Sequence, residues 1–278
     1  MEIGIFAKTF AVQSALASLT AAREAGYAVV QFNMAVLGGA SMPETIAPAT
    51  CAEIAAASAQ SGVAVAAVSG TYNMIHPDKA VRDDGFARLA TLIRAAPRMG
   101  IRLVTLCTGT RHATDQWAHH PDNAGAAAWR DLMVEMERAA AIAEECNVDL
   151  GVEPELANVV SSAALGRHLI DALGSPRVKI VLDPANLFEI APAAEARSII
   201  AQAVDLLADR IAMAHAKDRR ADGGFAAAGS GVIDFPHFVG KLRAAGFDGP
   251  LVTHGLSEAE APKVASFLHR VLGGAVAA

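Results

Sequence analysis

The sequence predicts an α/β protein, a single (β/α)8 TIM barrel over residues 1–278, because eight short apolar runs alternate with eight alanine-rich stretches of helical length. Several of the runs are apolar almost throughout, which is typical of parallel strands that helices cover on both faces. The length of 278 residues suits one such barrel, whose usual size is about 250 residues. A doubly wound open sheet is the alternative fold that the same alternation allows.

The expected strands are short and rich in valine, isoleucine and leucine. Turn residues or charged residues bound most of them, so each run reads as one strand. In chain order they cover residues 2–6, 27–32, 63–69, 102–107, 148–153, 178–183, 210–215 and 250–254.

Helices are expected between these strands, and most of the stretches carry a start or stop signal. Pro43-Glu44, Pro121-Asp122 and Ser257-Glu258 suit helix starts, whereas glycines such as Gly62 lie just beyond helix ends, where a left-handed residue is favoured. The expected helices cover residues 11–25, 44–61, 80–99, 122–146, 161–173, 194–208, 235–245 and 258–272.

Composition narrows the class of protein. The chain has 23 lysine and arginine residues against 29 aspartate and glutamate residues, a net charge of −6 that argues against a nucleic-acid partner. With 53% hydrophobic residues it can bury a large core. Its three cysteines form no CxxC pair, and we find no signal peptide or membrane-spanning run, so we expect a cytoplasmic protein that does not bind a membrane.

Ionisable residues stand at the ends of four consecutive expected strands. They are Glu153, Asp183, His215 and His254. Because catalytic groups of a barrel lie at the carboxyl ends of its strands, these side chains should converge there. Two carboxylates and two imidazoles would hold one divalent cation, and the mixed oxygen and nitrogen set suits Mn²⁺, Zn²⁺, Co²⁺, Fe²⁺ or Mg²⁺. The alternative is that they are unrelated polar residues at strand ends.

Five short segments resemble, in order along the chain, the xylose isomerase-like TIM-barrel superfamily, which includes sugar phosphate isomerases/epimerases and endonuclease IV-like proteins. The segments are GVEPE at 151–155, VLDPAN at 181–186, HAKD at 215–218, GSGVIDF at 229–235 and AGFDGP at 245–250. The resemblance implies a metal bound by Glu153, Asp183 and His215.

The sequence departs from the family pattern at the eighth strand, where His254 replaces a glutamate. In the ketose 3-epimerases of this superfamily, the glutamates of strands five and eight are implied to act as a paired acid and base. The resemblance therefore implies Glu153 and His254 as catalytic residues. An imidazole can move a proton near neutral pH, but not while its free lone pair is bound to a metal, so the roles of ligand and base compete for His254.

The loops after the other strands supply candidates for substrate binding. His112 and Trp117 lie in a long polar loop after the fourth strand, where an active-site lid is expected. We expect further contacts from the loop after the third strand and from the strand ends that carry the ligands, and we expect Lys217 to pair with Asp218. These further candidates are Tyr72, His76, Glu155, Asn186 and Lys217.

Together these features predict a metal-dependent sugar isomerase or epimerase, acting on a ketose, aldose or sugar phosphate by proton transfer next to a carbonyl. A metal-assisted lyase or dehydratase of a keto-sugar or keto-polyol is the main alternative. A non-catalytic barrel and an endonuclease for abasic DNA are two others, the latter disfavoured by the net charge. The expected partner is a small sugar, and the resemblance to similar barrels favours a homo-oligomer.

Overall fold

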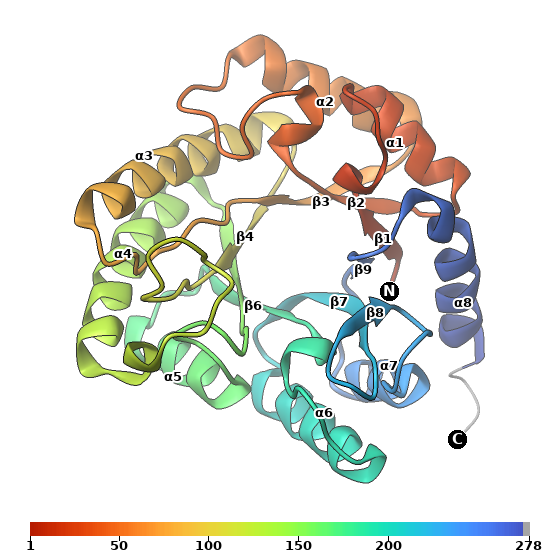
Figure 1. Ribbon diagram of the computed structural model, residues 1–278. Coiled ribbons are helices and arrows are strands. Elements are labelled where there is room, and N and C mark those ends of the chain that lie inside the picture. The colour runs from red at the N-terminus through yellow and green to blue at the C-terminus, as the bar shows by residue number, and fades with distance from the viewer. Residues whose placement is uncertain (275–278) are drawn as a thin grey trace.

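Eight parallel strands form a closed barrel with eight α-helices around it (Figure 1), as seen in a computed structural model that describes residues 1–274. Neighbouring strands pair in chain order from β1 to β7, and β9 closes the barrel between β7 and β1. The predicted TIM barrel is therefore confirmed, and the open doubly wound sheet is excluded. The barrel strands are β1 (Ile3–Phe6), β2 (Val29–Phe32), β3 (Ala64–Ser69), β4 (Leu103–Cys107), β5 (Asp149–Glu153), β6 (Val178–Leu182), β7 (Ile211–Arg219) and β9 (Leu251–Thr253).

One helix follows each barrel strand on the outside (Figure 1). Two of the expected helix starts begin as 3-10 turns: Pro121 opens one that ends at Ala124, before the α-helix at Ala126, and Ser257 caps one over Glu258–Glu260 that continues directly into the α-helix at Ala261. The start at Pro43-Glu44 is also displaced, because Ala47 is extended ahead of Pro48, the first residue of the helix. The helices are α1 (Ala15–Glu24), α2 (Pro48–Ser61), α3 (Lys79–Ala95), α4 (Ala126–Cys146), α5 (Ala163–Leu173), α6 (Ala193–Leu207), α7 (Phe235–Ala244) and α8 (Ala261–Gly274).

The seventh strand is longer than the sequence predicts. Beyond His215, β7 continues to Arg219 and pairs antiparallel with β8 (Phe225–Ala227), which lies outside the barrel order. The turn between them is closed by Asp222, whose Oδ1 accepts a hydrogen bond from the Gly224 amide at 2.9 Å. This hairpin therefore projects from the carboxyl end of the barrel.

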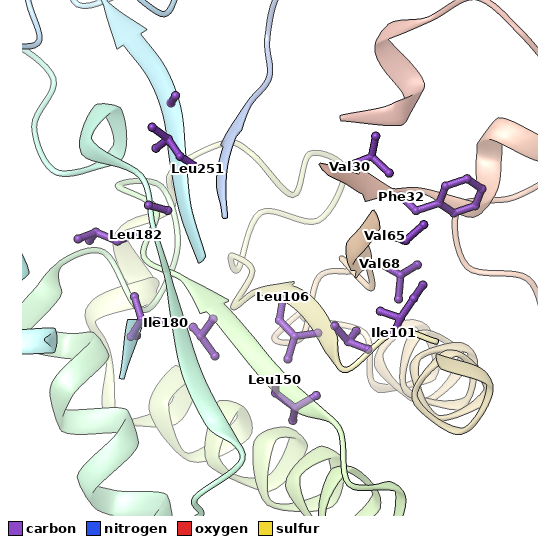
Figure 2. Packing of buried hydrophobic residues seen from close by; sticks show 14 of the residues in the cluster. Val30, Phe32, Val65, Val68, Ile101, Leu106, Leu150, Ile180, Leu182 and Leu251 are labelled. Atoms are coloured by element: carbon purple, nitrogen blue, oxygen red, sulfur yellow. The ribbon is translucent and has the colours of Figure 1, made fainter. Parts of the chain in front are cut away.

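Apolar side chains fill the space between the strands and the helices and also the inside of the barrel. Figure 2 shows part of the first layer, including Val68, Leu150 and Ile180. Successive residues of a strand face opposite sides, so Val181 belongs to a second, interior group. That group consists of Ala67, Leu103, Val181, Met213 and Val252, each from a different strand. Among the described residues, no helix is long and apolar enough to span a lipid bilayer.

Candidate functional site

The structure brings together the four ionisable residues that the sequence nominated as metal ligands. Glu153 ends β5, Asp183 follows β6, His215 lies in β7 and His254 follows β9. One nitrogen or oxygen atom from each lies within 4.8 Å of the others. The side chains of Asp183 and His215 are 0% and 1% exposed, whereas those of Glu153 and His254 are 12% and 17% exposed. The cluster is thus buried on one side and open on the other.

His215 is oriented by a hydrogen-bond network that reaches across the barrel. Its Nε2 lies 3.0 Å from Oε1 of Gln31, whose amide nitrogen donates to the hydroxyls of Ser69 and Thr105. Since Gln31 offers an oxygen, Nε2 carries the proton. The lone pair of Nδ1 then points to Oε1 of Glu153, 3.2 Å away.

Two acceptors that face one another need a cation between them or a proton on the imidazole. The donor set therefore fits a divalent metal ion, with Nδ1 of His215 as one of the ligand atoms. This fit follows from the positions of Gln31 and Glu153 on either side of the His215 ring.

Asp183 lies at the centre of the charges in the cluster. Its Oδ2 is 3.1 Å from Nζ of Lys217, 3.3 Å from Nε2 of His254 and 3.8 Å from Nδ1 of His215. Burial alone would raise the pKa of Asp183, but Lys217 and the hydrogen bond with His254 hold it well below its usual value. Burial would also raise the pKa of Glu153, but His215 brings it below its usual value. Both carboxylates are therefore ionised near neutral pH.

His254 is held by packing as well as by its contact with Asp183. Its ring stacks on Phe6 with centroids 4.6 Å apart and planes at 18°, and meets the ring of His215 edge-on at 4.6 Å. Burial lowers the pKa of His254, and the hydrogen bond with Asp183 offsets this only in part. A neutral imidazole is the form that binds a metal.

Lys217 supplies the positive charge of the metal-free cluster. Burial would lower the pKa of Lys217, but Asp183 and Glu153 raise it above its ordinary value. Its ammonium also donates to Oδ1 of Asn186 at 2.9 Å, and Asn186 in turn donates to Oε1 of Glu153 at 2.8 Å. Two carboxylates against one ammonium leave the cluster one negative charge in excess, which a divalent cation reverses.

The expected ion pair between Lys217 and Asp218 is wrong. Asp218 is fully buried and accepts hydrogen bonds from the backbone amides of Gly229, Gly231 and Ile233 at 2.9–3.0 Å. Consecutive residues of β7 point to opposite faces, so Lys217 shares the inner face with His215 while Asp218 faces the following loop. Glycine is required at 231, because a Cβ there would lie 2.1 Å from the Arg219 carbonyl oxygen.

A cavity of about 440 Å³, here called the cluster cavity, opens above Glu153 and His254. Of the predicted substrate-binding residues, Glu155, Lys217 and Trp117 line it. Asn186 is fully buried beneath it and contacts Glu153 and Lys217. Burial and the neighbouring Glu153 raise the pKa of Glu155 to about 7. Other lining residues include Phe6, Lys8, Gln31, Asn33, Thr105 and Phe225.

The remaining three candidates lie in a neighbouring pocket of about 560 Å³, here called the side pocket. They are Tyr72, His76 and His112. The Tyr72 hydroxyl donates to Glu135 at 2.9 Å, and Nδ1 of His112 accepts from the Asp115 amide at 3.1 Å. Their rings thus line the side pocket and not the cluster cavity, so any contact with a substrate depends on how far that substrate extends.

Sequence reasoning missed Gln31, Phe6 and Phe225. Gln31 carried a usable signal, since it is the polar residue of the otherwise apolar strand Val29–Phe32. Phe6 and Phe225 carried none, because an aromatic residue at a strand end is ordinary core or hairpin composition. Phe225 lies over the ammonium of Lys217, 4.0 Å from ring centroid to Nζ.

Solved structures with the same fold include several named as sugar epimerases. A 3-keto-D-glucoside 4-epimerase from E. coli matches with a TM-score of 0.76 and 17% identity over 98% of this chain and 99% of that chain. An L-ribulose 3-epimerase matches with a TM-score of 0.76 and 21% identity over 99% of this chain and 95% of that chain. A D-psicose 3-epimerase from Clostridium cellulolyticum H10, solved with D-tagatose, matches with a TM-score of 0.73 and 16% identity over 98% of this chain and 99% of that chain.

A sequence search of curated proteins finds no significant match. The family model described as xylose isomerase-like TIM barrel, in contrast, matches residues 19–270, a range that contains all four residues of the cluster. The chain therefore belongs to the xylose isomerase-like TIM-barrel family.

Proposed function

We propose that this protein is a divalent-metal-dependent sugar isomerase or epimerase that moves a proton next to a carbonyl. The observation that carries the proposal is the convergence of Glu153, Asp183, His215 and His254 at one end of the barrel, with Glu153 open to a cavity. The epimerase names of the similar structures support the same reaction class.

Glu153, Asp183, His215 and His254 would hold the metal. A bound divalent ion would polarise a carbonyl and a neighbouring hydroxyl of the sugar and so make the hydrogen between them easier to remove. The mixed carboxylate and imidazole set is compatible with Mn²⁺, Zn²⁺, Co²⁺, Fe²⁺ or Mg²⁺. Nε2 of His254 faces Asp183 and would be the ligand atom, so the proton of this ring would move to Nδ1 when a metal is bound.

Glu153 is the base in this proposal. Its Oε1 is engaged by Asn186 and faces His215, so Oε2 is the atom that would accept the proton from the substrate. Asn186 and Lys217 hold the carboxylate and its charge in place from below. Trp117, Glu155 and Lys217 line the same cavity and would contact the sugar hydroxyls.

A lyase or dehydratase of a keto-sugar or keto-polyol is the second candidate, and the positions of the carboxylates favour it. Of the cavity-lining carboxylates, Glu153 ends β5 and Glu155 lies two residues beyond it, whereas the end of β9, three strands further around the barrel, is followed by the imidazole of His254. Since no other carboxylate lines the cavity in the described part of the chain, loss of a β-hydroxyl competes with return of the proton to the other face of the sugar.

Proton exchange in deuterated water tests the proposal. We expect purified protein to contain one divalent metal per chain and to introduce deuterium next to the carbonyl of a ketose or 3-keto-sugar. Glu153→Gln should retain metal but lose the exchange, because the amide keeps the shape of the side chain and removes the base. A product that has lost one water identifies the lyase. A metal-free protein without exchange on any of these sugars contradicts the proposal and leaves the non-catalytic barrel.

A further inference from the structure

Two hollows meet at the loop after β4. The side pocket and the cluster cavity share Gln116 and Trp117. The Trp117 side chain is 52% exposed, although it is the largest apolar residue of this loop. A large aromatic ring left half in solvent between two hollows is a surface that a ligand can cover.

The lining of the side pocket is polar, and Asp115 is its one charged residue without an ion-pair partner among the described residues; its Oδ1 accepts a hydrogen bond from the Trp117 amide at 2.9 Å. Arg88 contacts Asp84 and Glu44 at 2.7 Å each, so its guanidinium is already neutralised. Nε2 of His76 lies 2.8 Å from the Ala113 carbonyl oxygen, which fixes this ring in the loop. Aromatic surface with neutral polar groups and one carboxylate suits a ring that carries hydroxyls, and the negative charge of Asp115 disfavours a phosphate ester.

The volumes indicate how the two hollows would be used. The cluster cavity alone, at about 440 Å³, is within the range of about 300–1,000 Å³ that small-molecule sites occupy. One sugar ring therefore needs no further space. The side pocket, at about 560 Å³, offers room for a second ring that is joined to the first and extends past Trp117.

We propose that the substrate is a glycoside, with its keto-sugar ring at the metal-ligand cluster and its second ring against Trp117 in the side pocket. This inference rests on the proposed function. It assigns a role to His112 and His76, which line the side pocket but do not reach the cluster cavity.

A third hollow of about 330 Å³ adjoins the cluster on the other side and is the competing place for a second ring. Phe6 and His254 line it together with Lys8 and Thr9. The Phe6 ring is stacked on His254 and Nζ of Lys8 lies 5.9 Å from its centroid, so the aromatic ring of this hollow already has a cation beside it. The side pocket is the better match to an uncharged ring.

The test compares a free sugar with its glycoside in the metal-loaded enzyme. Deuterium uptake from solvent gives kcat/KM for D-fructose, for 3-keto-D-glucose and for phenyl 3-keto-β-D-glucoside. We expect wild type to prefer the glycoside over the free keto-sugar by about tenfold or more, the value of one well-buried aromatic contact.

Val81 supplies the blocking variant, because it lines the side pocket from α3 and is 45% exposed. Val81→Trp should remove most of the preference for the glycoside. Val81→Ala at the same position, Thr9→Trp in the third hollow and Val134→Trp at an exposed position of α4 should each keep it.

Three other results would each contradict the inference, and each points to a different explanation. Equal or better kcat/KM for the free keto-sugar, or exchange on fructose alone, rejects the glycoside and leaves the isomerase or epimerase intact. A preference that is lost in Thr9→Trp and kept in Val81→Trp places the second ring in the third hollow. Absence of exchange on all three sugars rejects the proposed function itself.

Discussion

The ammonium of Lys217 lies 3.1 Å from Oδ2 of Asp183, the same oxygen that faces both imidazoles of the cluster. Both side chains are nearly inaccessible, at 8% and 0% exposure. A buried charge is costly unless a partner of opposite sign accompanies it. The lysine therefore keeps the carboxylate ionised in the metal-free protein, and the two residues depend on one another.

This mutual dependence predicts that Lys217 and Asp183 are strongly coupled in their effects on the free energy of unfolding. In metal-free protein, Lys217→Met should leave Asp183 without its main partner and lower the free energy of unfolding by about 3–5 kcal/mol. The double variant Lys217→Met with Asp183→Asn removes both charges and should recover much of that loss. Urea unfolding of the two single variants and the double variant gives the coupling directly. Additive losses would show that the two side chains do not interact.

Gln31 should control metal affinity without touching the metal. Gln31→Leu removes the acceptor that keeps the proton of His215 on Nε2, so Nδ1 no longer has a fixed lone pair towards Glu153. Loss of such an orienting partner typically costs about 10–100-fold in affinity. Titration of metal-free protein with Zn²⁺ or Mn²⁺ in a calorimeter measures it. Gln13→Leu, outside the cluster, is the control, and an unchanged Gln31→Leu affinity would contradict the network.

His254 should make metal binding sensitive to acid. A proton and a metal compete for Nε2, so affinity should be level above the ordinary histidine pKa of about 6.5 and fall at lower pH. Burial lowers the pKa of His254. The loss of metal affinity that protonation of His254 causes should therefore occur at a more acid pH than it would for a free histidine.

The variant His254→Glu separates this residue from His215. A carboxylate is protonated only near pH 4, so the affinity of the variant should fall less between pH 7.5 and pH 5.5 than that of wild type. The same substitution supplies the second carboxylate of the family pattern and should shift the activity profile towards lower pH. An equal fall in both proteins would mean that His254 is not a ligand.

Asp218 should hold the hairpin of β7 and β8 over the cluster cavity. Asp218→Asn replaces one of two accepting oxygens by an amide, so part of its three backbone hydrogen bonds to residues 229–233 is lost. A net loss of about 1–3 kcal/mol is expected, since a buried donor is left unpaired. Thermal unfolding measures the loss, and limited proteolysis should cut residues 220–231 faster. Asp222→Asn in the exposed turn is the matched control and should change little.

The sequence determined the barrel and the membership of the cluster. Alternation of apolar runs with alanine-rich helices is a local signal, and a closed parallel sheet must bring the carboxyl ends of its strands together. Glu153, Asp183, His215 and His254 could therefore be nominated together before any coordinates. The prediction that His254 departs from the family pattern rests on the sequence alone.

Only the tertiary structure decided how that cluster is supported and what lies beside it. The contact of Gln31 with His215 joins residues 184 positions apart, and no local pattern encodes it. The pairing of Lys217 with Asp183 in place of Asp218 follows from the two faces of β7, which depend on the strand continuing past His215. The structure also places Tyr72, His76 and His112 outside the cluster cavity. Their positions depend on how two long loops pack, and contacts with distant elements set the position of a loop more than its own sequence does.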